Sequence, residues 1–480
     1  MVSPKEETMS TRTNQIVTLL TLVLLLGWVL GACAPAPTAT PVPPPPAPKP
    51  TEVPKPTEAP KPTTAPTVAP TVAATKPPEQ ITLTVWDIYP EGQPFRKVLD
   101  NAIARFNKQY PNVKVVVVSS AIDVFKTKLV TALAAGGKDF DVFQTWGGGQ
   151  LATYARRGQV LELTDAMKQD KWQDQFSSAA LTFVTADGKI WGAPVELATV
   201  LFFHNTEMFK ANNVAVPKTF DDLLGACKTF KAKGIIPISL GMNKAAWTGD
   251  FFYQYLVTRA GGLDPFRKAI TREPGGTFDD PTFVQAGKLL VQMVDAGCFQ
   301  EGFLGAEYVS MRQLLGQEKA AMTLMGSWLP GQIATEFPAF LPKMDYFRFP
   351  LVAGGKGVDT DIVGGTNAAF AVSKATKYPK EATALLKEFT SNAAAADVLE
   401  IAKRLPAMKY KLDPAKVDAL TIRVADELNK ATAVQLYYDQ SSTPGLANTH
   451  LDLITGVFAK TITPEKNAAD WEAAAKKELQ

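Results

Sequence analysis

The sequence predicts an α/β protein with two lobes and a cleft between them. Three observations lead to this prediction. Apolar strands alternate with helices from residue 81 onward, the strands are more numerous than one sheet needs, and several end in an aromatic residue beside a glycine or polar loop. Alternating strands and helices are typical of parallel sheets covered by helices, and such sheets bind small molecules at the carboxyl ends of their strands.

The chain opens with an apolar segment that indicates export. Fifteen uncharged residues run from Ile16 to Leu30, too few for a membrane span of about 20 residues and suited to a signal-peptide core. The sequence Leu30-Gly-Ala-Cys33 follows and resembles the lipobox of bacterial lipoproteins, in which the cysteine is acylated. We therefore predict a lipoprotein signal peptide over residues 1–32 and lipidation of Cys33. An ordinary secretory signal and an uncleaved anchor are the alternatives.

Residues 33–79 are predicted to form a tether rich in proline, threonine and alanine. Of the 36 prolines in the chain, 17 lie between Pro35 and Pro78. Proline fixes φ and lacks an N–H, so this segment forms neither helix nor sheet and samples extended polyproline II. At about 3.1 Å per residue, roughly 45 residues reach at most about 140 Å. A disordered terminus without a tethering role is the alternative.

Charge and composition exclude several classes of function. The formal net charge is +3, with 50 basic and 47 acidic residues interspersed, so no nucleic-acid surface is indicated. The two histidines, His204 and His450, cannot supply a histidine-rich metal site, and the motifs of P-loops, serine hydrolases and zinc proteases are missing from the sequence. We expect no metal, no cofactor and no enzymatic activity, although a glycosidase with two carboxylates would carry no such motif.

The first ordered segment predicts the succession strand, helix, strand, helix, strand. Residues 81–86 alternate in polarity, apolar residues over 98–106 have helical spacing, and the valine-rich 113–118 is expected to be a strand buried on both faces. A helix over 123–135 ends at a glycine pair, and a third strand follows over 141–145. This succession predicts a parallel sheet.

Later segments repeat the pattern. Four further strands and three further helices are expected, namely strands at 200–204, 235–240, 320–325 and 368–372, and helices at 205–211, from Phe220 with Thr219 as N-cap, and up to about Thr390. Two cysteines remain besides Cys33. Export permits a Cys227–Cys298 disulfide, but Cys227 lies on the apolar face of a predicted helix, and we expect two buried thiols.

Several short motifs follow one another along the chain. They are Gly188–Pro194, Phe203–Phe209 with Val216–Leu223, Gln317–Trp328, the pair Gly364-Gly365 before Ala369–Ser373, and Arg404–Pro406. Their order and spacing resemble the extracytoplasmic solute-binding proteins of ABC importers, in the sugar-binding group that includes maltose-binding protein. His204, Phe220 and Glu318 differ from the residues usual in that family.

The resemblance implies a two-lobed clamp that closes over its ligand by hinge bending. Lobe 1 would comprise residues 80–193 and 365–405, and lobe 2 residues 194–364 and 406–480. The implied partners are a sugar, an ABC permease with its ATPase subunits, and the membrane through the lipid anchor. We expect a monomer located outside the cytoplasm and anchored to the cell membrane by Cys33.

The resemblance also implies a set of ligand-binding residues by matched position. Trp328, Trp247 and Trp146 would stack on sugar rings, and Glu196 would accept hydrogen bonds from hydroxyls. The remaining expected contacts are Asp87, Tyr89, Glu91, Thr145, Gly365, Thr366, Asn367 and Asp439. The chemistry agrees, because sugars present hydroxyls at their edges and C–H groups on their faces. Three other tryptophans, Trp172, Trp191 and Trp471, are expected in the core.

Other functions stay open at this point. A surface-anchored carbohydrate-active enzyme fits the anchor and the acidic and aromatic residues, and a purely structural surface lipoprotein would bind nothing. Within the receptor class, the solute is a sugar, a polyol, glycerol phosphate or another polar compound.

Overall fold

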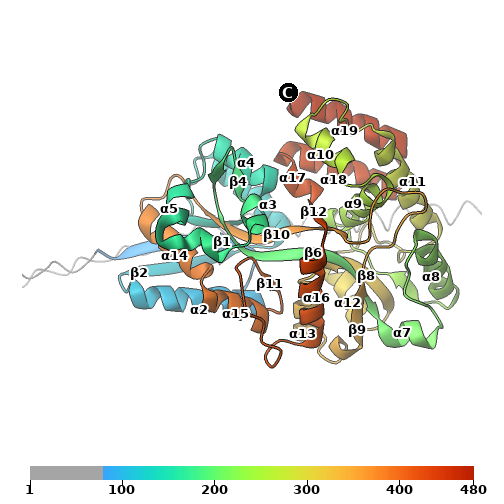
Figure 1. The fold of residues 1–480 in the computed structure, drawn as a ribbon, viewed down its shortest axis with the longest axis horizontal. Coiled ribbons are helices and arrows are strands. Elements are labelled where there is room, and N and C mark those ends of the chain that lie inside the picture. Colours follow the sequence, from blue (N-terminus) through green and yellow to red (C-terminus); the bar gives the residue numbers. More distant parts are fainter. Residues whose placement is uncertain (1–78, 480) are drawn as a thin grey trace, which may run out of the picture. The chain divides into compact units, whose positions relative to one another are not determined.

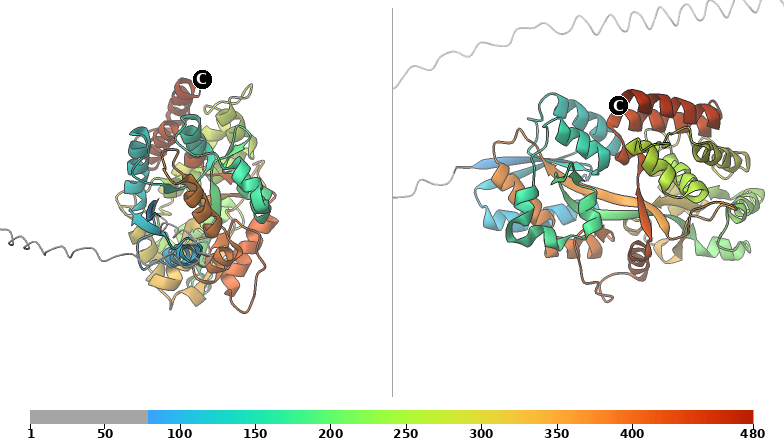
Figure 2. Two further views of the ribbon diagram at one scale, coloured as in Figure 1. Left: turned by 90° about the vertical axis from the view of Figure 1, so that its left-hand side faces the viewer. Right: turned by 45° about the horizontal axis from the view of Figure 1, so that its top comes forward.

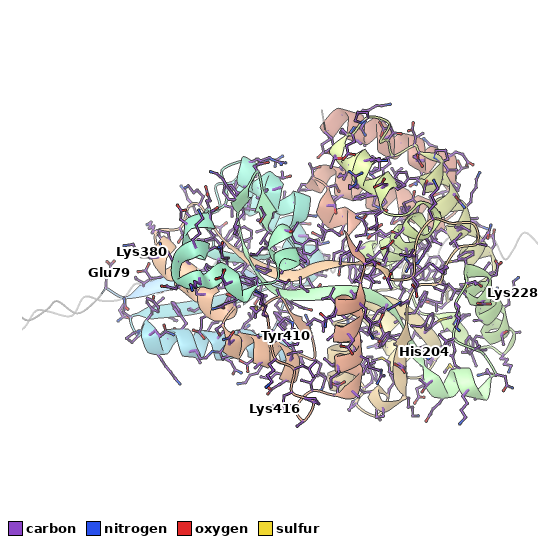
Figure 3. All side chains as sticks on the ribbon, viewed as in Figure 1. Glu79, His204, Lys228, Lys380, Tyr410 and Lys416 are labelled. Carbon is purple, nitrogen blue, oxygen red and sulfur yellow. A yellow bond between two sulfur atoms is a disulfide. The ribbon has the colours of Figure 1, made fainter. Side chains whose placement is uncertain are left out.

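The computed structural model describes residues 79–479. The predicted signal peptide, the lipidation site Cys33 and the tether up to residue 78 lie outside the described residues. Glu79 lies at the outer end of the first strand (Figure 3). Within residues 79–479, no helix combines the length and apolar character that a membrane crossing needs.

A mixed sheet runs through the structure, with helices on both sides (Figures 1 and 2). Its main path has the order β2-β1-β3-β10-β6-β8-β7. The strands are β1 (Ile81–Asp87), β2 (Val113–Ser119), β3 (Val142–Thr145), β6 (Ala193–Asn205), β7 (Ile236–Ile238), β8 (Ala320–Gly326), β9 (Met344–Phe347), β10 (Asp361–Val372), β11 (Leu405–Pro406) and β12 (Ala433–Leu436), with a separate hairpin of β4 (Thr185–Ala186) and β5 (Lys189–Ile190).

Helices alternate with strands from β1 to β3 as expected, whereas between β7 and β8 and after β12 several helices follow one another. In chain order they are α2 (Pro94–Gln109), α3 (Ile122–Ala134), α4 (Gly148–Arg156), α5 (Thr164–Lys168), α6 (Ser178–Thr182), α7 (Thr206–Ala211), α8 (Phe220–Ala232), α9 (Trp247–Gly261), α10 (Asp264–Thr271), α11 (Pro281–Asp295), α12 (Tyr308–Gly316), α13 (Leu329–Glu336), α14 (Pro379–Phe389), α15 (Asn392–Glu400), α16 (Ala419–Lys430), α17 (Tyr438–Ser441), α18 (Pro444–Phe458) and α19 (Pro464–Glu478).

The first lobe contains the predicted parallel sheet. β1 pairs in parallel with β2 on one side and β3 on the other, and α2 and α3 connect these strands. The burial predicted for β2 is wrong, because β2 is the outermost strand of the path and only Val113 is fully buried. Val118 on β2 is 37% exposed. An edge strand covered on one side tolerates the same valines that a central strand would require.

Two long strands, β6 and β10, continue through both lobes (Figure 1). They pair antiparallel, and both are longer than the segments predicted within them. The glycine pair of β10 permits the close pairing. A Cβ on Gly364 would lie 2.4 Å from the Ala198 carbonyl oxygen, and Gly365 adopts a φ of 142° that favours glycine.

The second lobe has a sheet of mixed direction. β8 and β9 pair antiparallel with β6, whereas β7 pairs in parallel with β8.

At the start of α8, the Thr219 hydroxyl accepts from the Asp222 N–H at 3.1 Å, and Asp222 accepts in return from the Thr219 N–H at 2.9 Å. This capping box confirms the N-cap predicted for α8.

Each lobe has its own hydrophobic core. One cluster fills the second lobe and includes Phe252, and two smaller clusters in the first lobe are built around Phe106 and Phe143. His204 lies on β6 in the second lobe (Figure 3), 4% exposed against Phe209. Burial lowers the pKa of His204. Separate cores are what a pair of lobes needs in order to move as units.

A disulfide joins Cys227 on α8 to Cys298, just after α11. The Cα atoms lie 4.9 Å apart, within the range that a disulfide spans. Both residues are fully buried, so the predicted burial is confirmed but the prediction of two free thiols is wrong. The Ile238 N–H donates to the Cys298 carbonyl at 2.9 Å, which places Cys298 beside β7, the strand that follows α8. The sequence alone does not show that Cys227 and Cys298 lie side by side, because this depends on the tertiary packing of α8 and β7.

Candidate functional site

A cavity of about 560 Å³ lies where residues of both lobes meet. On one side it is lined by residues that follow the carboxyl ends of β1, β2 and β3. On the other side the lining comes from α9, α12 and the segments around Trp328 and Tyr437. Clefts at the carboxyl ends of parallel strands are the usual binding places in α/β folds.

The structure brings six of the twelve sequence-predicted binding residues to the cavity wall, namely Tyr89, Trp146, Trp247, Trp328, Asn367 and Asp439. The other six lie outside the lining. Five of these are buried, namely Asp87, Thr145, Glu196, Gly365 and Thr366, whereas Glu91 is exposed. Trp172 and Trp471 are buried in hydrophobic clusters, as expected for core residues, and Trp191 is partly buried.

Aromatic side chains form one wall of the cavity. The set comprises Trp247, Phe251, Tyr308, Trp328 and Tyr437, which we call the aromatic wall. Their ring centroids lie 5.2 Å apart for Trp247 and Tyr308 and 6.3 Å apart for Trp247 and Trp328. Tilted contacts at these distances stabilise the rings against one another. The wall therefore presents a fixed apolar surface to the cavity.

Hydrogen bonds and a glycine hold Trp328 in place. The Trp328 Nε1–H donates to the Tyr308 hydroxyl at 3.0 Å, and that hydroxyl donates to Gln332 Oε1 at 2.7 Å. The indole lies directly on Gly326, where a Cβ would come within 2.0 Å of the ring. The Arg312 guanidinium lies 4.5 Å above the Tyr308 ring. The Gly326-Ser-Trp328 sequence thus has a local reason, because any side chain at position 326 would displace the indole.

The opposite wall is built around Trp146. Phe125 packs against Trp146 edge to face at 6.0 Å, and Lys126 Nζ lies 5.2 Å from the Trp146 ring. Lys126 also pairs with the Asp439 carboxylate at 3.1 Å. Asp439 lies on α17. This helix approaches α4 so closely that a Cβ on Gly149 would fall 2.2 Å from a backbone oxygen of α17. The glycines after Trp146 therefore position Asp439 at the cavity.

A buried ion pair lies between the cavity and the crossing strands. Arg404 Nη1 donates to Glu196 Oε2 at 2.9 Å, and the guanidinium lies 5.6 Å from the Tyr89 ring. Burial raises the pKa of Glu196, and the Arg404 charge and the Asn367 amide oppose that effect. Arg404 lines the cavity, whereas Glu196 does not. Glu196, predicted to bind sugar hydroxyls, thus lies behind the cavity wall and pairs there with Arg404.

Asp87 holds the loop that carries Tyr89. It accepts from the Ser119 hydroxyl at 2.5 Å and from the Tyr89 N–H at 3.1 Å. Burial raises the pKa of Asp87, and these hydrogen bonds oppose the shift. Thr145 plays a similar part after β3, where its hydroxyl accepts from the Gly147 N–H at 3.4 Å. Both residues shape the cavity from behind its surface.

Three buried polar atoms of the lining have no hydrogen-bond partner. They are the hydroxyls of Tyr89 and Tyr437 and Oε1 of Gln440, on residues that are 2%, 4% and 3% exposed. Tyr89 lies beside Arg404, but the two do not complete a hydrogen bond of good geometry. A buried polar group without a partner costs about 1–3 kcal/mol. All three residues line the cavity, so their unused hydrogen-bonding positions lie close to the space that a ligand would occupy.

Sequence reasoning missed several residues of the lining. Tyr308, Arg312, Gln332, Arg404 and Tyr437 belong to this group. Arg404 stood in a recognised motif but was not assigned to the site, and Tyr437 has no local signal. The next residue, Tyr438, lies in the core, where its ring stacks on Phe266 with the ring centroids 3.7 Å apart. In residues 79–479, no group of three or more histidine, cysteine, aspartate or glutamate side chains is arranged to hold a metal ion.

Comparison with known proteins places this geometry in a family. The bacterial extracellular solute-binding protein family matches residues 88–396. An uncharacterized ABC transporter extracellular-binding protein of Pyrococcus horikoshii is 25% identical over 59% of this chain and 64% of its own length. The multiple sugar-binding protein of Streptococcus mutans is 26% identical over 42% of this chain and 48% of its own length. The chain thus spans about half to two thirds of the length of these two relatives.

Solved structures show the same fold. One, from work on xylan utilization by the thermophilic bacterium Caldanaerobius polysaccharolyticus, is 35% identical and has a TM-score of 0.76, covering 82% of this chain and all of its own. A chitin oligosaccharide binding protein is 26% identical with a TM-score of 0.77 and covers 83% of this chain and 99% of its own. The chain belongs to the bacterial extracellular solute-binding protein family, with the two-lobed α/β fold that its sequence predicted.

Proposed function

We propose that the protein is an extracytoplasmic receptor that binds a sugar or oligosaccharide and delivers it to an ABC permease. The carrying observation is the composition of the cavity lining, which combines the aromatic wall with three buried polar atoms that lack partners. Aromatic faces match the C–H faces of a sugar ring, and its hydroxyls match the open hydrogen-bond positions. The sugar-binding relatives and the chitin oligosaccharide binding protein support this class of ligand.

The charges of the lining favour a neutral ligand. Three of the four cationic residues of the lining, Lys126, Arg312 and Arg404, each already pair with a carboxylate, at 3.1, 2.7 and 2.9 Å. The fourth, Lys244, makes no ion pair within residues 79–479, and its charge is offset in the lining by that of Asp123. A phosphate or carboxylate ligand would have to compete with these partners and lose its own hydration, which is unfavourable in a buried site. A polyhydroxyl compound would leave the ion pairs intact. Glycerol phosphate is therefore a weaker candidate than a sugar.

We further propose that binding closes the two lobes and that the closed form docks on the permease. The lobes would comprise residues 80–193 with 365–405, and residues 194–364 with 406–480. Their connection through β6 and β10 supports bending at these strands. A lipid anchor on Cys33 would keep this monomeric receptor at the membrane, near the permease and its ATPase subunits.

Isothermal titration calorimetry against mono- and oligosaccharides tests the proposal. We expect micromolar or tighter binding to at least one sugar, with the ligand recovered unchanged by chromatography after incubation. Recovery of shortened or modified sugar would instead indicate a carbohydrate-active enzyme. Binding of polyols alone would reassign the solute, and no binding to the whole panel would contradict the proposal. Trp191→Ala is a matched control for variants of cavity tryptophans, because Trp191 lies outside the lining.

A further inference from the structure

A second groove adjoins the cavity along α3. It has a volume of about 700 Å³ and is lined mainly by α3, with Trp86 from the end of β1 and Asp139 from the loop before β3. We call it the α3 groove. Asp123 and Lys244 line both the cavity and the α3 groove, so the two spaces meet at these residues. Each volume is within the range of about 300–1,000 Å³ typical of small-molecule sites.

We propose that the α3 groove binds the outer units of an oligosaccharide whose inner units fill the cavity. This inference rests on the proposed function of the cavity. It makes the ligand an oligosaccharide longer than the cavity holds, entering over the boundary formed by Asp123 and Lys244. None of the twelve predicted binding residues lines this groove. Trp86, at the end of the first predicted strand, has the strand-end position expected near a ligand but was not included among them.

The chemistry of the α3 groove suits a neutral polyhydroxyl chain. Trp86 is half-buried and packs on Phe140 with ring centroids 4.8 Å apart, which fixes the indole as a platform. Thr127 and Thr131 stand one helical turn apart on the exposed face of α3, and their hydroxyls donate only to carbonyls of the same helix. Their oxygens remain open as acceptors for sugar hydroxyls.

The charged groups of the α3 groove are balanced and largely free. The Asp123, Asp139 and Lys244 side chains make no ion pair within the described part of the chain. Lys128 lies 4.6 Å above the Trp86 ring. An exposed contact of this kind contributes only about 0.5–1 kcal/mol, so the flexible lysine can give way to a sugar ring. Two carboxylates and two ammonium groups give no net charge, which disfavours an anionic occupant such as phosphate.

Calorimetry with ladders of malto-, xylo- and chito-oligosaccharides, from disaccharide to hexasaccharide, tests the proposal. For the ladder that binds, we expect wild-type affinity to rise by a further factor of about 10 once the chain outgrows the cavity, the size expected for one aromatic stacking contact. Thr131→Arg should fill the α3 groove and abolish this rise while short chains bind as before. Trp86→Ala should act in the same way.

Val130→Arg is the matched control, since Val130 precedes Thr131 on α3, is 38% exposed and lines neither space. Equal length dependence in Thr131→Arg and Val130→Arg would overturn the proposal, and so would a wild type whose affinity does not rise with length. Both outcomes differ from failure of the proposed function, in which no member of any ladder binds. Because Thr131 is exposed on a helix, its variant tests the groove even if Trp86→Ala fails to fold.

Discussion

Removal of the Cys227–Cys298 disulfide should destabilise the second lobe without changing ligand affinity. The bond closes a segment of 71 residues. Chain-entropy arguments assign about 4.4 kcal/mol to a loop of that length. Over roughly 400 residues, an unfolding entropy of about 2.1 cal/mol/K per residue converts this into a melting temperature lower by roughly 5 °C. Alanine at both positions avoids leaving a buried hydroxyl without a partner.

Circular dichroism melts of wild type and the double variant Cys227→Ala/Cys298→Ala, without reductant, measure this difference. The disulfide is buried away from the cavity lining. Calorimetry with a sugar that binds should therefore give equal affinities for wild type and the double variant. Alkylation of the denatured, unreduced wild type should leave both cysteines unlabelled. Melting temperatures within about 1 °C of each other would refute the loop-entropy reasoning, and labelling of Cys227 and Cys298 would show that the bond does not form.

Four further substitutions test the cavity and the anchor. Trp328→Ala should weaken sugar binding by about 10-fold or more, from a lost stacking contact of about 1.5 kcal/mol plus buried area, and calorimetry that finds unchanged affinity would remove Trp328 from the site. Arg404→Met should lower the free energy of unfolding in urea by about 3–5 kcal/mol, because Glu196 is left buried without its partner. Burial raises the pKa of Glu196 above 4.5, so its contribution to stability is complete below pH 4.5 and is lost as the pH rises through the folded-state pKa. Glu196→Gln should remove that pH dependence. If the free energy of unfolding in urea changes with pH between 4 and 8 in the same way for wild type and for Glu196→Gln, this reasoning is contradicted. Cys33→Ser should release the protein from the membrane fraction with ligand binding intact, whereas firm membrane retention on immunoblots of fractionated cells would show that residues 16–30 act as an uncleaved anchor.

The spacing of apolar residues predicted those elements in which the spacing is regular over the whole segment. The β1–α2–β2 segment alternates or repeats cleanly, and the structure confirms its type and parallel pairing. β6 was found only in part, because all of its 13 residues are buried and include Glu196, a residue that no strand pattern would place in a core. Only residues 368–372 of β10 were predicted as a strand. The glycine pair before them was not included, because its role in the strand depends on the close approach of β6. Burial and pairing with distant strands decide these positions.

The candidate site shows the same division. The tryptophans were predicted by matched position in the family, in agreement with their place after strand ends, and Trp146, Trp247 and Trp328 do reach the cavity. Glu196 was also predicted by matched position, yet its side chain pairs with Arg404, which is 208 residues away in the chain. Tyr308 carries no pattern of its own and matters because its hydroxyl connects Trp328 to Gln332. Residues that act through another side chain have no local signature.

The two strands shared by both lobes add a free-energy cost to any bending of the proposed clamp. Separate linkers would let the lobes swing freely, but β6 and β10 pair as an antiparallel ladder whose register is irregular only between Thr366 and Ala369, with β12 alongside β10. In the proposed clamp, the stiffness of this ribbon would set how often the empty receptor visits the closed shape. Apparent affinity scales with that resting population. Sequence changes in this ribbon at residues outside the cavity lining would therefore tune the affinity of the proposed receptor without altering which sugar it prefers.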